Sequence, residues 1–305
     1  MILQVIPAQS EHIEGLARSC IAAFAEFNTQ HLLTMGTPGN VESARQMYSR
    51  LLVSDRAHVI VALQNGEVVG STWLRLEDDI AAFEDVNTAP SKQGNGVARA
   101  LMTHGLEVAN GLGYAKIRLT QSAHNSTALS LYASLGFEVK ETFAEMKATT
   151  GKAPESPESL GVRPMTEADL PAIEDVSRRL YKLNRRGDVA AALASGEPAL
   201  VVAPRDGVTG YVTLGGSAHG MAESEAEAVA LITEAASRYP EKAVFGCPLG
   251  LHGLFRKALQ IGYRTLERST ASWHTAPTSG PAASGCHRLR ISSPDGTHTG
   301  KSAEI

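Results

Sequence analysis

The first half of the chain combines short apolar runs with stretches in which apolar residues recur at helical spacing. Two apolar runs flank the dipeptide Asn65-Gly66, which predicts a β-hairpin over residues 59–74 with a tight turn at that dipeptide. The pattern predicts an amphipathic helix over 97–111 and, after it, a strand with apolar alternation over 114–120.

A second helix follows that strand, because Asn125 is a favoured N-terminal cap and Gly136 a favoured C-terminal stop. Residues 82–88 predict a further strand directly before a glycine-rich segment, and residues 1–6 predict the first strand. The expected order over about residues 3–148 is helix, hairpin, strand, glycine-rich loop, helix, strand, helix, strand.

The pattern recurs weakly in the second half. Residues 162–173 repeat the arrangement of residues 5–16, in which a strand ends at a proline and a helix capped by Ser or Thr begins. Residues 199–212 echo the hairpin, and residues 254–264 echo the ending Leu135-Gly136-Phe137. A chain of 305 residues is long enough for two domains, so a tandem repeat is expected.

The glycine-rich segment joins a strand to the helix predicted at 97. Such a turn leaves backbone N–H groups pointing outward at the positive end of the helix dipole, which is a site for a pyrophosphate. A Walker P-loop is excluded because Val97-Ala98 stands where Lys-Ser/Thr is needed. A dinucleotide fingerprint beginning at Gly94 is excluded because its third small position falls on Arg99 and no βαβ repeat surrounds it. An ordinary glycine-rich turn opening a helix is the structural alternative.

Gln93, Gly96 and Ala98 form the pattern Gln-x-x-Gly-x-Ala. This segment resembles the coenzyme A loop of the GNAT N-acetyltransferases, Gln/Arg-x-x-Gly-x-Gly/Ala. The segment from Asn125 through Leu131-Tyr132 to Leu135-Gly136-Phe137 resembles the second signature of that family. The resemblance implies an α/β (α+β) fold of two tandem GNAT-like domains, each a mixed, mostly antiparallel sheet flanked by helices.

The expected domains follow from this resemblance and from composition. Residues 1–150 are expected to form a GNAT acetyltransferase domain with an intact acetyl-CoA loop. Residues 151–160 are expected to be a linker, because 151–159 are rich in Pro, Ser and Glu. Residues 161–274 are expected to form a degenerate GNAT-like domain, since residues 218–227 place acidic side chains where the loop belongs. Residues 275–305, dense in Ser, Gly, Pro, Thr and His, are expected to be a disordered tail.

The resemblance implies acetyl transfer from acetyl-CoA, as co-substrate, to a primary amine. By position, Tyr132 matches the general acid that protonates the leaving thiolate; the alternative is a tyrosine that packs in the core. Asn125 is either a pantetheine ligand, a helix cap or both. Lys92 and Arg99 either contact phosphates or are solvated. The residues expected to bind acetyl-CoA are Val86, Asn87, Thr88, Gln93, Gly94, Asn95, Gly96, Val97, Ala98, Arg99 and Asn125.

The general base is less defined by the sequence. Glu84 is the predicted base, and strict alternation puts it on the face of Val86 and Thr88 with Asp85 opposite. A solvated edge carboxylate, His31 and water-mediated deprotonation are the alternatives.

Composition says more about the cellular compartment and the classes of partner than about the substrate. Three cysteines far apart, without metal-ligand spacing, favour a reducing compartment and predict a cytoplasmic protein with no metal site. A net charge of −4 argues against nucleic-acid binding, and no apolar run reaches membrane-spanning length. The acceptor is expected to be a small-molecule or protein amine, and an oligomer is possible. A non-catalytic acyl-CoA-binding regulator and a transferase of another short acyl group are the competing functions.

Overall fold

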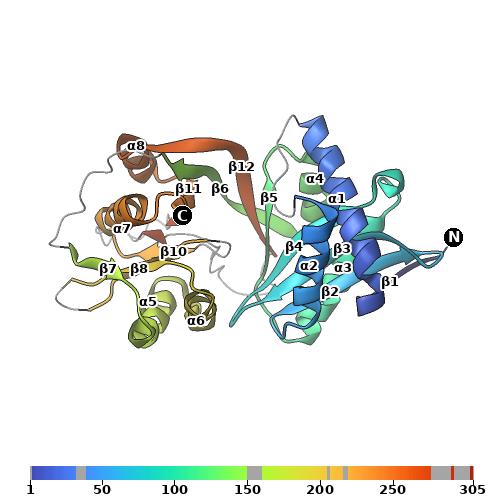
Figure 1. The fold of residues 1–305 in the computed structure, drawn as a ribbon, viewed down its shortest axis with the longest axis horizontal. Coiled ribbons are helices and arrows are strands. Elements are labelled where there is room, and N and C mark those ends of the chain that lie inside the picture. The colour runs from blue at the N-terminus through green and yellow to red at the C-terminus, as the bar shows by residue number, and fades with distance from the viewer. Residues whose placement is uncertain are drawn as a thin grey trace. The chain divides into compact units, whose positions relative to one another are not determined.

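The computed structural model describes residues 2–31, 39–149, 160–204, 207–215, 219–275, 290–291 and 303–304 (Figure 1). The predicted linker, apart from Leu160, and most of the predicted tail lie outside the described residues. The described chain divides into two compact units, residues 1–120 with 131–136 and residues 121–130 with 137–305.

The first unit is built on strands that follow the predicted order. Each of the first four strands pairs antiparallel with the next one along the chain; they are β1 (Leu3–Pro7), β2 (Ala57–Gln64), β3 (Glu67–Leu76) and β4 (Ala81–Thr88). Strand β4 also pairs, in parallel, with β5 (Ile117–Ser122). The β2–β3 turn at Asn65 and Gly66 has positive φ at both residues, as an Asn-Gly hairpin requires. The predicted hairpin is confirmed.

Helices cover both faces of this sheet (Figure 1). Helices α1 (Ile13–Gln30) and α2 (Val41–Leu52) pack on Val59, Val61 and Leu63, whereas α3 (Val97–Gly111) packs on Ile60 and Ala62. Because both faces of β2 are covered, its apolar residues form a continuous run and do not alternate with polar ones. The helix predicted over residues 97–111 is confirmed at both ends.

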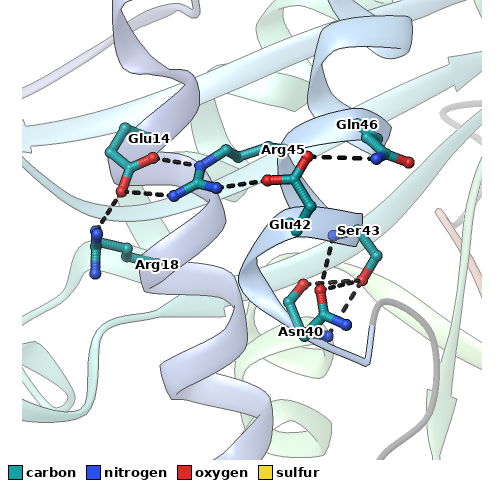
Figure 2. Close-up of polar contacts among 7 residues, drawn as sticks. All are labelled: Glu14, Arg18, Asn40, Glu42, Ser43, Arg45 and Gln46. Atoms are coloured by element: carbon teal, nitrogen blue, oxygen red, sulfur yellow. Dashed lines mark hydrogen bonds and ion pairs between the residues drawn. The ribbon is translucent and has the colours of Figure 1, made fainter.

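Charged side chains join α1 and α2 on their outer surface (Figure 2). Glu14 accepts hydrogen bonds from Arg18 and Arg45, at 2.5 Å each, and Arg45 also donates to Glu42 at 2.6 Å. Asn40 caps α2, because its Oδ1 accepts from the backbone N–H of Ser43 at 2.9 Å. The charged pairs are exposed and screened by solvent, so they contribute little to stability.

The second repeat has the element order of the first. Its elements are the strand β7 (Val162–Pro164), a short 3₁₀ turn (Glu167–Asp169), α5 (Leu170–Tyr181), α6 (Arg186–Ala194), β8 (Ala199–Val202), β9 (Gly210–Thr213), β10 (Gly220–Ala222), α7 (Glu225–Arg238), β11 (Val244–Pro248), α8 (His252–Gln260) and β12 (Tyr263–Thr275). In the first repeat a 3₁₀ turn (Ser10–His12) likewise follows β1, and α4 (Ser126–Ser134) and β6 (Phe137–Ala148) close the series. Residues 290–291 (β13) and 303–304 (β14) pair with one another.

Apart from the β13–β14 pair, the described strands of the second unit form two groups. Strands β10, β9, β8 and β7 form an antiparallel sheet in that order. Strand β6, the last strand of the first repeat, pairs antiparallel with both β11 and β12 of the second repeat. The buried cluster of this unit includes Met146 of β6, Leu231 of α7 and Leu254 of α8. A strand from the first repeat therefore contributes to the core of the second unit.

Candidate functional site

The glycine-rich loop places two glycines in the left-handed region. Gly94 has φ +76° and Gly96 has φ +79°, and Gly96 is the N-cap of α3. Among the described residues, no atom lies within 4 Å of the position that a Cβ would take at either glycine. The side of the loop on which a side chain would project is therefore open, and glycine is required by backbone conformation and not by crowding.

The backbone of this loop has unused hydrogen-bond donors. The first backbone bond of the helix runs from Ala100 N to Gly96 O at 3.0 Å. Among the described residues, no backbone N–H from Gly94 to Arg99 has a hydrogen-bond acceptor. A row of free N–H groups at a helix N-terminus is an anion-binding arrangement.

Side chains tether the loop at both ends. Gln93 Nε2 donates to Glu26 Oε2 of α1 at 3.2 Å, and Lys92 Nζ donates to Gln64 Oε1 at 2.7 Å. Arg99 donates to Ser134 Oγ, at 2.8 Å, and so joins the first turn of α3 to the last turn of α4. The structure thereby brings the loop close to the helix that carries Tyr132.

Strands β4 and β5 pair only at their beginnings. Their parallel register runs from Ala81↔Ile117 to Phe83↔Leu119 and ends there, whereas β4 stays paired with β3 as far as Thr88. The two strands therefore separate beyond Phe83. This separation leaves the second half of β4 without a backbone partner on its β5 side among the described residues.

A β-bulge lies in this unpaired stretch of β4. The register passes from Trp73↔Glu84 to Ser71↔Asn87, so Asp85 and Val86 together oppose Thr72. Asp85 has φ +47°, a left-handed conformation. The bulge breaks the alternation expected from the sequence, because Glu84 shares a face with Asn87 and not with Thr88.

Side-chain hydrogen bonds hold the bulge. Thr72 Oγ1 donates to the Glu84 carbonyl at 2.9 Å, and Asn87 Nδ2 donates to the Asp85 carbonyl at 3.0 Å and to Ser71 Oγ at 2.8 Å. Ser71 Oγ shares a further hydrogen bond of 3.0 Å with the hydroxyl of Tyr48, which is fully buried. The side chain of Asn87 thus supports the backbone of β4.

The two carboxylates at the bulge have different partners. Arg75 donates to Glu84 Oε1 at 2.7 Å and also pairs with Glu77, at 3.0 Å, whose side chain is buried. Asp85 Oδ2 accepts from Trp73 Nε1 at 3.3 Å. Burial raises the pKa of both carboxyl groups; the Arg75 charge opposes this rise at Glu84, and the Trp73 hydrogen bond opposes it at Asp85.

Tyr132 lies in α4 with a side chain that is 6% exposed. Burial raises the pKa of its phenol well above the usual value, so the phenol is protonated at neutral pH. Asn125 is a helix cap, because its Oδ1 accepts from the backbone N–H of Ala128 at 3.0 Å. His31 ends α1, and its ring contacts its own helix through Phe27, with ring centroids 4.3 Å apart.

The helix of the second repeat that corresponds to α3 has a different N-terminus. Ser224 caps α7, and the carboxylate of Glu227, 8% exposed, accepts from Ser224 Oγ at 3.0 Å and from Thr209 Oγ1 at 2.6 Å. The carboxylate of Glu225 lies within 3 Å of the position that a Cβ would take at Gly253. The protein's own carboxylates therefore occupy this helix start, where negative charge is favoured.

Sequence reasoning missed Trp73 and Gln121, and it placed Asp85 on the strand face opposite the predicted base. Trp73 and Asp85 lie at the bulge, whose position depends on hydrogen bonds between strands. Gln121 of β5 is 7% exposed, and neither atom of its side-chain amide has a hydrogen-bond partner among the described residues. Because β5 also contains Arg118, Thr120 and Ser122, the sequence carried no signal that singled out Gln121.

Parts of the chain are similar to known proteins. The family described as Acetyltransferase (GNAT) family matches residues 24–137. The mycothiol acetyltransferase of Brachybacterium faecium is 36% identical over 100 residues, which cover 31% of this chain and 30% of that relative. The match thus spans less than a third of the length of this relative.

Two solved structures are similar over nearly the whole chain. A putative acetyltransferase from Pyrococcus horikoshii has a TM-score of 0.64 at 15% identity and covers 92% of this chain and 90% of its own. A tandem GNAT protein from the clavulanic acid biosynthesis pathway has a TM-score of 0.58 at 16% identity, covering 92% of this chain and 100% of its own. At these identities the likeness concerns the fold, and the fold is that of a tandem GNAT protein.

Proposed function

We propose that this chain is an N-acetyltransferase that transfers the acetyl group of acetyl-CoA to a primary amine, and that the first repeat carries the reaction. The observation that carries the proposal is the row of free backbone N–H groups from Gly94 to Arg99 at the N-terminus of α3. A pyrophosphate accepts several such hydrogen bonds at once, and the open side of Gly94 and Gly96 leaves room for it.

The unpaired half of β4 is proposed to receive the pantetheine arm. Val86, Asn87 and Thr88 follow the last β4–β5 pair, so their backbone groups on that side are available to a ligand. We propose that the loop residues, Gln93 to Arg99, bind the phosphates, and that Asn125 orients the arm in addition to capping α4.

The reaction needs a base for the amine and an acid for the thiolate. The neutral amine attacks the thioester carbonyl, the C–S bond breaks, and the thiolate takes a proton. We propose Tyr132 as the acid, since its buried phenol stays protonated at neutral pH. Glu84, the base predicted from the sequence, is one of two adjacent carboxylates on β4 that are able to take the amine proton.

The second repeat is proposed to have lost cofactor binding. Glu227 and Glu225 occupy the start of α7, and their negative charge would repel a pyrophosphate. The likeness to mycothiol acetyltransferase covers 31% of the chain, so the acceptor, a small-molecule or protein amine, is not inferred from it.

The proposed compartment is the cytoplasm, which supplies acetyl-CoA. The two described cysteines, Cys20 and Cys247, are free and buried, as a reducing compartment allows. No helix among the described residues is long and apolar enough to span a bilayer.

Thermal melting with acetyl-CoA, coenzyme A, NAD and ATP in parallel tests the cofactor. A ligand at 100 times its Kd adds about 2.7 kcal/mol of stability, which raises Tm by on the order of 5 °C for a domain of this size. We expect a shift with acetyl-CoA and coenzyme A but not with NAD. A shift with NAD or ATP alone would contradict the proposal. Binding of acetyl-CoA without turnover of any acyl-CoA would favour the regulatory alternative.

A further inference from the structure

A chain of buried polar side chains crosses the first unit from helix α2 to the bulge of β4. The hydroxyl of Tyr48 on α2 shares a hydrogen bond of 3.0 Å with Ser71 Oγ on β3, and Ser71 Oγ accepts from Asn87 Nδ2 at 2.8 Å. The same nitrogen donates to the backbone carbonyl of Asp85 at 3.0 Å. Tyr48 and Ser71 are fully buried, and Asn87 is 5% exposed. The chain therefore links α2 to the backbone of β4 through the interior.

Helix α1 joins this chain at two points. The thiol of Cys20 interacts with the Tyr48 hydroxyl, and Ser19 Oγ donates to Asn87 Oδ1 at 3.4 Å. Burial raises the pKa of the Tyr48 phenol, so the phenol is neutral and can donate as well as accept. The nitrogen and the oxygen of the Asn87 amide are both engaged. A flipped amide would turn Oδ1 toward the carbonyl of Asp85, where two acceptors repel, so the orientation of this amide is fixed.

Packing does not require polar side chains at these positions. Tyr48 belongs to the buried cluster beneath α1 and α2, whose other members include Leu16, Val59 and Val61. Replacing both partners of a buried hydrogen bond by apolar groups of the same shape is nearly neutral for stability or even favourable. A satisfied buried network instead fixes one geometry. The geometry that this network fixes is the position of the Asp85 carbonyl.

The carbonyl that the network holds belongs to a residue in an unusual conformation. The non-glycine residues of positive φ in the described chain are Asn65, Asp85 and Lys182, and of these only Asp85 lies within a strand. A left-handed non-glycine residue is unfavourable and persists where the surrounding structure imposes it. The hydrogen bond from Asn87 supports this conformation, and with it the bulge at the point where β4 has parted from β5.

We propose that Tyr48 and Ser71 are positioning residues of the acetyl transfer: acting through Asn87, they hold the bulge so that its backbone groups on the side left by β5 point at the thioester. This inference rests on the proposed acetyltransferase function, and it gives a part in the reaction to α2, outside the strand and the loop proposed for the cofactor. The attack of the amine builds negative charge on the thioester oxygen, which N–H donors stabilise if they are already oriented when the reaction begins. A rigid buried network supplies that orientation.

The test follows the carbonyl band of bound acetyl-CoA by difference infrared spectroscopy, with a heavy carbon isotope at the thioester carbonyl. Hydrogen-bond donors that polarise the carbonyl lower its stretching frequency, so the band in the wild type should lie below that of free acetyl-CoA. In Tyr48→Phe, which keeps the aromatic ring, and in Ser71→Ala, the band should return most of the way to the free value. The Kd for coenzyme A, which lacks the carbonyl, should stay unchanged in calorimetry, because the loop proposed for the phosphates contains neither residue.

Tyr263→Phe is the matched control. Tyr263 of β12 is 1% exposed, and its hydroxyl donates to the Ile232 carbonyl at 2.8 Å within the second unit. Removing this hydroxyl should lower stability in urea melts about as much as Tyr48→Phe does. The carbonyl band of bound acetyl-CoA should stay at its wild-type position.

A band that returns toward the free value in the network variants, with an unchanged Kd for coenzyme A, supports the proposal. A band that these variants leave in place, or that Tyr263→Phe moves equally, overturns it, and so does a wild-type band at the free value. A matching loss of coenzyme A affinity also overturns it, because a general defect of the fold then explains the change. Ser71→Ala decides the matter if Tyr48→Phe does not fold. Absence of acetyl-CoA binding to the wild type overturns the proposed function itself, which the thermal shift reports separately.

Discussion

The substitution Gly96→Ala separates the stability of the loop from its binding function. Gly96 has φ +79°, and an added Cβ would meet no atom of the described part of the chain within 4 Å. The fold therefore bears only the cost of a left-handed alanine, about 1–2 kcal/mol. For a protein of this size that cost lowers Tm by about 2–8 °C.

The effect on cofactor affinity should be larger. The methyl group would project into the open side of the loop, from which a pyrophosphate approaches the free N–H groups between Gly94 and Arg99. Loss of two hydrogen bonds to a charged group costs about 1.5–3 kcal/mol each. The Kd for coenzyme A should therefore rise about 100- to 10,000-fold.

Isothermal titration calorimetry with coenzyme A measures this difference. Gly113→Ala is the matched control, since Gly113 has φ +86° and equally open space but follows the end of α3, remote from its N-terminus. Both variants should lose similar stability, and only Gly96→Ala should lose affinity. Equal affinity in the two variants would refute the assignment of the loop. A loss of stability well beyond that of Gly113→Ala would refute the energetic argument.

Three further substitutions test other parts of the structure. Tyr132→Phe should keep coenzyme A binding and lower kcat by about 100-fold or more. Because burial raises the pKa of the phenol, the wild-type rate should not fall at mildly basic pH through ionisation of Tyr132. A fall that the wild type shows and the variant lacks would contradict the raised pKa. Gln121→Met removes a buried amide without partners and should raise the free energy of unfolding by about 1–3 kcal/mol in urea melts; a lower value would mean that water satisfies the amide. Asp169→Asn should lower the free energy of unfolding by on the order of 1 kcal/mol at neutral pH, after allowance for solvent screening. The reason is that a hydrogen bond from Arg163 holds the pKa of Asp169 at about 2, below its value near 4 in the unfolded chain. That stability is present above about pH 4 and is lost as pH falls toward 2, so a difference between wild type and variant that persists in urea melts near pH 2 would contradict the pairing.

The parts of the fold that depend on local signals were predictable from the sequence. The turn at Asn65-Gly66 and the helix from Val97 to Gly111 follow from turn chemistry and apolar periodicity, and both are confirmed. The strand expected from Tyr114 begins at Ile117, because the N–H of Tyr114 still bonds to the Ala109 carbonyl at the end of α3.

The geometry of β4 was not predictable, because it depends on residues distant in the sequence. Thr72 and Asn87 hold the bulge across two strands, and a period of two in the sequence carries no sign of the extra residue. The pairing of β6 with β11 could not be predicted either, because the sequence shows that a strand exists but not which edge it joins. The roles assigned to Glu84, Tyr132 and Asn125 remain predictions.

The position of β6 bears on how the two repeats depend on one another for folding. Strand β6 precedes residue 150 in the chain, yet its hydrogen bonds run to β11 along Val244–Pro248 and to β12. A chain cut after residue 150 would present β6 with unpaired edges and exposed apolar side chains, and the remaining piece would lack the strand between β11 and β12. Gene deletion of either half would therefore damage the other, so selection for folding alone is sufficient to preserve the second repeat.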